Sequence, residues 1–204
     1  SSDVCSSDLN IGAEAGAKAA PDGYTLTLAA AGFMAVNPSV YPKLNYDSVN
    51  DFQPVTLLVK APLLLVVNPK MPVQSARELI DWAKKNPGKL NLANGGTGTA
   101  QHLGGVSFAL AAQTDINHVP YKGSAPATTD LLGGVVDAQF DNMVTLIPYV
   151  KNGNLRALGV SSSRRVPTLP EVPTLAENAP DCLDTEAWLR SMRMWRTPAM
   201  KWCR

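Results

Sequence analysis

The segment 90–105 constrains the fold more than any other stretch of the chain, and it reads Leu-Asn-Leu-Ala-Asn-Gly-Gly-Thr-Gly-Thr-Ala-Gln-His-Leu-Gly-Gly. A short apolar strand leads into a loop of glycine and threonine, which then opens a helix. The apolar positions Leu103, Val106 and Leu110 follow the helical period and predict that helix. The first amides of a helix lack internal acceptors and carry partial positive charge, so the loop predicts an anion-binding site.

The same pattern recurs further along the chain. A strand is predicted at 117–121, a loop at 122–124 and a helix at 126–132, and a further strand at 135–140 ends at Asp141 and Asn142. Strands alternating with helices predict an α/β fold with a largely parallel sheet, in which ligands collect at the carboxyl ends of the strands. We therefore expect both glycine loops and Asp141 to share one edge of the sheet. The other predicted elements are helices at 11–19, 75–86 and 145–151 and strands at 24–31, 55–59, 63–67 and 155–160.

Composition excludes several classes of protein. With 204 residues, 45% of them hydrophobic, the chain is long enough to bury a core as one large domain or two small lobes. The net charge of +1 argues against a nucleic-acid surface, although five cations fall in the last sixteen residues. The three cysteines lie far apart and match neither a zinc site nor a disulfide framework. No apolar run is long enough for a membrane span, and the first nine residues do not resemble a signal peptide.

Enzymatic interpretations find little support in the residues. The run from Gly96 begins like a dinucleotide fingerprint, but Gln101 stands where the third glycine belongs, and no P-loop lysine follows. Ser124 lacks the frame of a hydrolase nucleophile, and His102 and His118 are the only histidines. Two histidines without a cysteine or acidic cluster make no metal site. A nucleotide-binding α/β enzyme nevertheless stays open as an alternative.

Recognition of a small anion by backbone amides and hydroxyl groups remains. Thr97, Thr99 and Ser124 are expected to supply hydroxyl donors, and the glycines of the two loops let a ligand approach the backbone closely. No arginine lies in either loop. Tight connection is the alternative explanation for each glycine loop, and capping of the next helix is the alternative for Asp141.

Seven collinear motifs resemble the Bug-type solute-binding receptors of tripartite tricarboxylate transporters. They run from Asn10 to about Trp188, and they are Asn-Ile-Gly-Ala-Glu-Ala (10–15), Ala-Ala-Pro-Asp-Gly-Tyr-Thr-Leu (19–26), Asn-Pro-Ser-Val-Tyr-Pro-Lys-Leu-Asn-Tyr-Asp (37–47), Gly-Thr-Gly-Thr-Ala-Gln-His-Leu (96–103), Val-Pro-Tyr-Lys-Gly-Ser-Ala-Pro-Ala (119–127), Phe-Asp-Asn (140–142) and Leu-Pro-Glu-Val-Pro-Thr (169–174).

The resemblance implies a periplasmic, two-lobed Venus-flytrap protein of type II that binds a small carboxylate or dicarboxylate. It implies no catalysis and no cofactor, delivery of the ligand to membrane permease subunits, and a monomer that binds no nucleic acid. Loop amides, hydroxyl groups and ordered waters would hold the carboxylates. The ligand-binding residues that it implies are Thr97, Gly98, Thr99, His102, Gly123, Ser124, Ala125 and Asp141, with Ala31 and Gly32 from the facing lobe.

The ends of the chain depart from the family pattern. Residues 1–9 and about 189–204 look unrelated to it and are expected to be foreign or disordered. We expect a complete second lobe over 66–162, which binds the carboxylate, and a partial first lobe formed by 1–65 and 163–204. The strands 63–67 and 155–160 would then be the two crossings between the lobes. A non-functional fragment of such a receptor is a further alternative.

Overall fold

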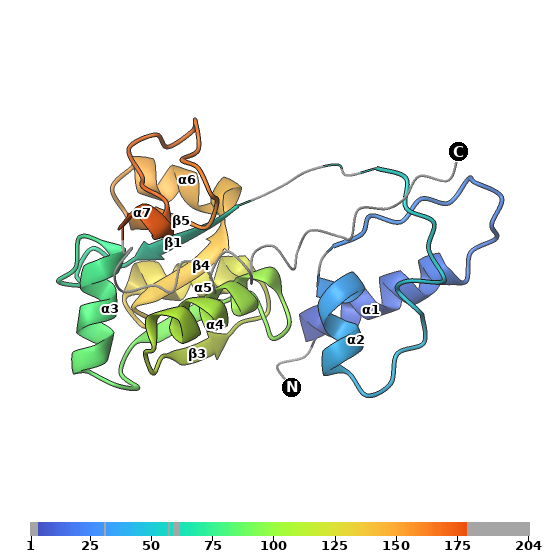
Figure 1. Cartoon of the computed structure of the whole chain (residues 1–204), viewed down its shortest axis with the longest axis horizontal. Helices are drawn as coiled ribbons and strands as arrows, with labels where there is room; N and C mark the ends of the chain where they lie inside the picture. The colour runs from blue at the N-terminus through green and yellow to red at the C-terminus, as the bar shows by residue number, and fades with distance from the viewer. Residues whose placement is uncertain (1–3, 31, 57, 59–61, 179–204) are drawn as a thin grey trace.

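The computed structural model describes residues 4–30, 32–56, 58 and 62–178, and Figure 1 shows their arrangement. A sheet with its helices lies on the left of that view, and the first helices lie on the right. The elements in chain order are α1 (Val4–Ala17), the π-helix η1 (Gly32–Val36), α2 (Asn37–Val40), β1 (Leu63–Val67), α3 (Ala76–Lys85), β2 (Asn91–Asn94), α4 (Ala100–Ala112), β3 (Asn117–Pro120), α5 (Ser124–Gly133), β4 (Ala138–Asn142), α6 (Met143–Lys151), β5 (Arg156–Val160) and α7 (Leu175–Asn178).

Five strands form one mixed sheet in the order β3-β2-β4-β1-β5. Strand β2 runs parallel to β3 and β4, whereas β1 runs antiparallel to both of its neighbours, β4 and β5. Four strands therefore share one direction and β1 alone opposes them. The predicted α/β fold is confirmed, but the sheet is mixed rather than largely parallel, because the two strand pairs that contain β1 are antiparallel. The carboxyl ends of β2, β3 and β4 lie at one edge.

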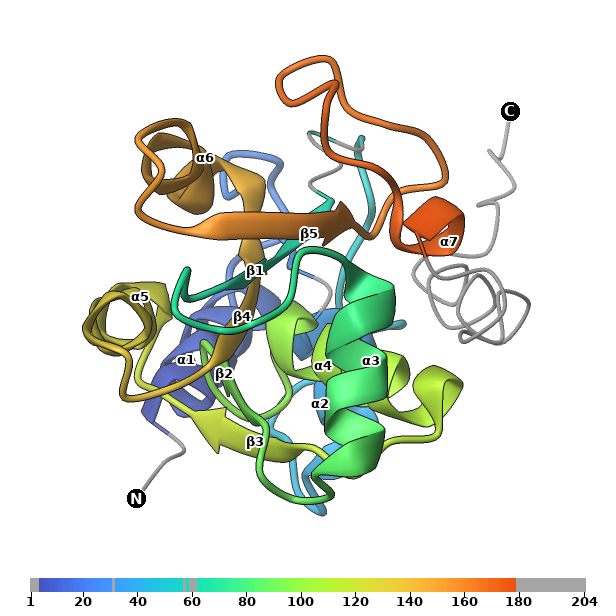
Figure 2. The same ribbon diagram turned by 90° about the vertical axis from the view of Figure 1, so that its left-hand side faces the viewer.

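The sheet is buried on both faces because helices cover each side (Figure 2). Leu63, Leu65 and Val67 of β1 belong to a core with α3 and α4, and the alternate residues Leu64 and Val66 belong to a second core with α5 and α6. Side chains alternate across a strand, so an uninterrupted apolar run is what a strand between two helical layers requires. The strand predicted at 63–67 is therefore confirmed with its bounds.

A modified capping box stands at the start of α3. The Ser75 hydroxyl accepts a hydrogen bond from Glu78 N at 3.1 Å, while the Glu78 carboxylate accepts one from Gln74 N at 2.7 Å. These contacts satisfy two backbone amides near the helix start, which would otherwise have no partner. Helix α3 ends at Lys85, one residue before the end that the sequence pattern predicts.

Helix α4 packs on the sheet through glycine rather than leucine. Leu103 and Val106 are only half-buried and Leu110 is 73% exposed, although their spacing predicted the helix. A Cβ atom at Gly104 would lie 2.7 Å from a Leu63 methyl carbon, and one at Gly105 would lie 2.8 Å from a methyl carbon of Leu92. The helix thus approaches the sheet more closely than a larger side chain would permit.

The predictions for the first 60 residues are less accurate. Helix α1 begins at Val4 rather than Ile11 and includes residues 4–9 of the segment expected to be foreign or disordered. The strand predicted at 24–31 is wrong over 24–30, and the described residues 55, 56 and 58 form no strand. Tyr24, Leu26 and Leu28 are exposed. A strand needs a neighbour for its backbone hydrogen bonds, and apolar alternation alone does not supply one.

A small satellite cluster joins α1 to the residues around α2. Ala13 and Tyr46 are its buried members, and the Tyr46 and Phe52 rings meet edge to face at 6.3 Å. Beside them, Asn10 Oδ1 accepts hydrogen bonds from Asn37 Nδ2 at 2.6 Å and from Tyr46 Oη at 3.0 Å. This cluster holds the N-terminal helices together. None of the helices in the described part of the chain is long and apolar enough to cross a membrane.

Candidate ligand-binding site

The two glycine loops lie side by side at the carboxyl ends of β2 and β3. Because these strands are parallel neighbours, the chain leaves both at the same edge of the sheet. Tyr121 N donates to Asn94 O at 3.0 Å, and Gly123 N donates to Gly95 O at 3.2 Å, so the loops are bonded directly to each other. The expectation that they share one edge is confirmed.

Three glycines in these loops adopt backbone conformations that other residues avoid. The φ angles are +126° at Gly96, +79° at Gly98 and +104° at Gly123. An L-amino acid with a side chain rarely adopts such values, so glycine is required here by geometry. These conformations let each loop turn sharply into the helix behind it. The loops thereby place backbone amides at the starts of α4 and α5.

The side chain of Asp141 lies beside the two glycine loops and is bonded to the helix starts behind them. It lies within β4 rather than after it, and it is 0% exposed. Its Oδ1 atom accepts from Gln101 Nε2 at 3.1 Å, Ser124 Oγ at 2.9 Å and Asn142 N at 2.7 Å, and its Oδ2 atom accepts from Gln139 Nε2 at 2.9 Å. A buried carboxylate is tolerated when hydrogen bonds compensate its lost hydration, as these four do.

The hydrogen bonds of Asp141 give it a structural role that differs from helix capping. The N-cap of α6 is Asn142, so Asp141 does not occupy the capping position that was its alternative explanation. Its carboxylate faces protein donors inside the fold and is closed to solvent. It therefore fixes the positions of groups around the loops, above all Gln101 and Ser124.

Sequence reasoning missed Gln101 and Gln139. Gln101 was noted only as the residue that breaks a dinucleotide fingerprint, yet it bonds the first turn of α4 to β4. Gln139 is fully buried and also accepts from Thr128 Oγ1 at 3.2 Å. A polar residue two positions before Asp141 in a buried strand lies on the same face, and that spacing is a signal that could have found it.

The hydroxyl groups differ from the expectation that they donate to a ligand. Thr99 is the N-cap of α4, where its hydroxyl accepts from His102 N at 3.3 Å and donates to Gly96 O at 2.6 Å. Ser124 donates its hydroxyl proton to Asp141. Each proton is thus engaged within the protein. Thr97 is half-buried, and its hydroxyl makes no hydrogen bond to any residue that the structure describes.

His102 lies between the first glycine loop and the ring of His118. Its Nδ1 atom accepts a long hydrogen bond of 3.4 Å from Gly98 N, and its ring meets the His118 ring edge to face at 5.8 Å. Burial lowers the pKa of His102, and burial together with the nearby His102 lowers the pKa of His118. The Nδ1 atom of His118 is buried without a partner among the described residues.

Of the remaining predicted positions, Ala125 and Gly32 lie within the described residues. Ala125 is exposed in the first turn of α5. Gly32 begins η1, and a Cβ atom there would lie 3.4 Å from Gly98 O, so this residue faces the first glycine loop across the chain. Ala31 lies outside the described residues.

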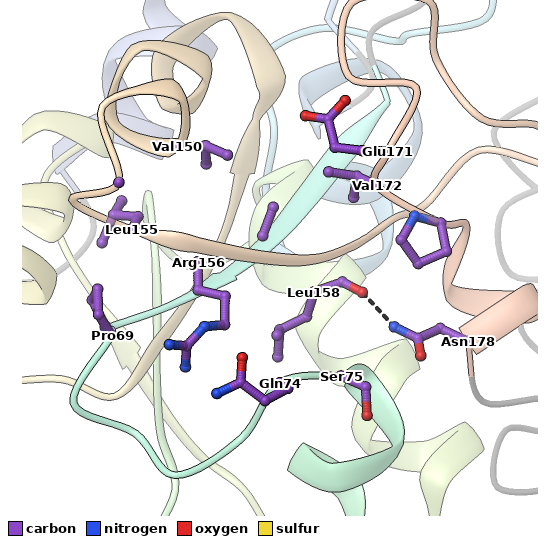
Figure 3. Close-up of a pocket in the computed structure, with 13 residues that line it drawn as sticks. Pro69, Gln74, Ser75, Val150, Leu155, Arg156, Leu158, Glu171, Val172 and Asn178 are labelled. Carbon is purple, nitrogen blue, oxygen red and sulfur yellow. Dashed lines mark hydrogen bonds between the residues drawn. The ribbon is translucent and has the colours of Figure 1, made fainter.

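A separate groove lies along β5, at the opposite edge of the sheet from β3 (Figure 3). Its volume is 480 Å³, and its lining includes Gln74, Arg156, Leu158, Glu171 and Asn178. Arg156 Nη1 donates to Met71 O at 3.3 Å and to Val73 O at 2.8 Å, so its guanidinium fastens the loop before α3. This groove contains none of the residues predicted to bind a ligand.

Comparison with known proteins matches this chain to one family of receptors. The model of the tripartite tricarboxylate transporter family receptor matches residues 5–199, a range that includes parts of both terminal segments. Protein BugT of Bordetella pertussis is 44% identical over 168 residues, covering 82% of this chain and 52% of BugT. The chain spans about half the length of the curated relatives that it matches.

Solved structures agree with that match. R. palustris Rpa4515 with adipate is 33% identical, with a TM-score of 0.79 over 91% of this chain and 67% of that one. MatC from Rhodopseudomonas palustris with bound malate is 27% identical, with a TM-score of 0.74 over 90% of this chain and 69% of MatC. The structural neighbours include the periplasmic binding protein BugD, and receptors of this kind are not enzymes. The chain belongs to the tripartite tricarboxylate transporter receptor family.

Proposed function

We propose that this chain carries the carboxylate-binding lobe of a periplasmic solute receptor. The ligand is a small carboxylate or dicarboxylate, and the receptor delivers it to the membrane permease subunits of a tripartite tricarboxylate transporter. The observation that carries the proposal is the pair of adjoining loops, with Gly96, Gly98 and Gly123 at positive φ and a helix start behind each loop. Such loops present backbone amides to an anion, and two of the structural neighbours were solved with adipate and malate.

Binding energy would come from several weak contributions. Each helix start contributes about 0.3 to 1 kcal/mol to an exposed anion and about 2 kcal/mol when partly buried. Thr97 adds a hydroxyl donor and Ala125, exposed in the first turn of α5, adds a backbone amide, while Gly98 lets the ligand approach the first loop closely. Asp141 and Gln101 act as positioning residues, because they hold the two helix starts at a fixed separation. We assign His102 to the rim of the site as a neutral side chain.

The lobe proposed for 66–162 is supported by the way its two ends meet. Strands β1 and β5 are antiparallel neighbours. Leu63 N donates to Ser161 Oγ, and Ser161 N donates to Leu63 O, both at 2.9 Å, although the two residues are 98 positions apart. The chain thus enters and leaves the sheet at one place, as two adjacent crossings between lobes would. We propose that Gly32 belongs to the facing lobe and that the receptor is a monomer.

Calorimetric titration of the whole chain with succinate, malate and adipate tests this proposal, with AMP and ATP as the competing class of ligand. The expected result is saturable binding of at least one dicarboxylate and none of the nucleotides. Binding of a nucleotide alone would favour the α/β enzyme interpretation. Absence of binding by every carboxylate, in a sample whose circular dichroism and cooperative unfolding show that it is folded, would support a non-functional fragment instead.

A further inference from the structure

The hydroxyl group of Ser124 is turned toward the protein, and this orientation restricts what it can bind. We propose that Ser124 is a specificity-determining residue that accepts a hydrogen bond from a ligand hydroxyl, so that the site prefers a hydroxylated dicarboxylate to the unsubstituted one. The inference rests on the proposed carboxylate-binding function. It goes beyond that function by naming a feature of the ligand other than its carboxylates.

The direction of the hydrogen bond between Ser124 and Asp141 follows from the other partners of the carboxylate. Ser124 Oγ lies 2.9 Å from Asp141 Oδ1, and the same oxygen accepts from the backbone amide Asn142 N at 2.7 Å. A backbone amide can only donate, so Asp141 is an acceptor here. Gln101 Nε2 also donates to Oδ1, and Gln139 Nε2 donates to Oδ2, so both carboxylate oxygens already act as acceptors and Ser124 supplies the proton in their contact.

Ser124 can then interact with a ligand only as a hydrogen-bond acceptor. A serine hydroxyl carries one proton and two acceptor sites. Because Ser124 donates this proton to Asp141, the Ser124 oxygen can accept a hydrogen bond but cannot donate one to a ligand carboxylate. Ser124 is half-buried at the first position of α5, directly after Gly123, so it belongs to the loop that the proposed function places against the ligand. A ligand group that reaches it must bring its own proton.

The other groups proposed to face the ligand are hydrogen-bond donors, whereas Ser124 is an acceptor. Thr97 and the loop amides donate, which suits a carboxylate. The Thr99 hydroxyl is engaged at both ends, on Gly96 O and on His102 N. Beside Ser124 lies the negative charge of Asp141, which disfavours a second carboxylate at the same point. A hydroxyl group on the carbon chain of the ligand satisfies both conditions.

Malate and succinate test the proposal directly, because they have equal chain lengths and two carboxylates and differ in one hydroxyl group. Titration of the chain is expected to show malate binding about 3- to 10-fold more tightly than succinate, the worth of one ordinary hydrogen bond. In Ser124→Ala the preference is expected to disappear through weaker malate binding, with succinate unchanged. Ser124→Thr keeps a hydroxyl group and should keep the preference.

Thr129→Ala is the matched control, because Thr129 lies on the same helix and its exposed hydroxyl donates only to Ala125 O at 3.1 Å. It should leave the malate-to-succinate ratio unchanged. Equal affinities of the unaltered chain for the two ligands would overturn the proposal without any variant. Equal weakening of malate and succinate binding in Ser124→Ala would also overturn the proposal, because the Ser124 oxygen would then bind an ordered water rather than the ligand hydroxyl. Failure of every carboxylate to bind would refute the proposed function as well, so the two failures are distinguishable.

Discussion

Gln101 Nε2 lies 3.1 Å from Asp141 Oδ1, and this contact fastens the first turn of α4 to the end of β4. The same oxygen accepts from Ser124 at the first position of α5. One buried carboxylate therefore fixes two helix starts that follow different strands of the sheet. The spacing of the two glycine loops depends on it.

Asp141→Asn is expected to destabilise the fold strongly. The new amide nitrogen would face a donor, either Gln139 Nε2 or the group of donors around Oδ1, and a buried donor would lose its partner. The expected loss in the free energy of unfolding is about 2 kcal/mol or more, measured by urea denaturation. Asp81→Asn, at an exposed position of α3, should change it by less than about 0.5 kcal/mol. Equal effects of the two variants would contradict the role assigned to Asp141.

Gly98→Ala is expected to weaken dicarboxylate binding by about tenfold or more. A residue with a Cβ atom is strained by about 1 to 2 kcal/mol at the φ angle of +79° that Gly98 adopts, and the methyl group would stand on the ligand-facing loop. Gly12→Ala is the control, because a Cβ atom within α1 meets nothing within 4 Å there. That variant should bind normally and be slightly more stable. Unchanged affinity in Gly98→Ala, measured by calorimetry, would remove the first loop from the site.

The sequence predicts the region from β1 to β5 well because the signals in that region are local. Glycines at positive φ after β2 and β3, the Ser75 cap and the apolar run of β1 each determine their own element. The predicted meeting of the two loops with Asp141 followed from parallel strand order alone. These features need no knowledge of distant residues, and the structure contains all of them.

Other features depend on partners that a linear pattern does not reveal. The alternation of Tyr24, Leu26 and Leu28 predicts a strand, but no strand in the described part of the chain pairs with these residues. The apolar spacing of α4 does not reveal its buried face, because close helix-to-sheet packing selects Gly104 and Gly105 over the leucines. The direction in which Ser124 donates depends on Asp141, which lies 17 residues further along the chain.

The two histidines predict a pH dependence of stability between pH 5 and 7.5. Burial lowers the pKa of His102 and His118, so the unfolded chain binds protons at a higher pH than the folded chain does. Stability is then complete above about pH 6.5, the unfolded value, and falls as the pH drops from there toward the folded pKa values. Glu14, Asp47 and Glu177 have lowered pKa values below 4.5 and do not titrate in this window.

Urea denaturation at pH 7.5 and pH 5 measures this dependence. The chain should be less stable at pH 5, and His118→Gln should lose less stability between the two values than the unaltered chain does. Lys84→Gln, at an exposed position of α3 outside the histidine pair, serves as a control with an unchanged pH response. A pH response that His118→Gln leaves intact would show that the histidine pair is not its source.

Amide resonances observed by NMR during titration with malate locate the ligand site. We expect the largest chemical-shift changes on residues 96–99 and 123–125, in the two glycine loops at the carboxyl ends of β2 and β3. Changes centred instead on the groove at Gln74, Arg156 and Leu158 would contradict this expectation.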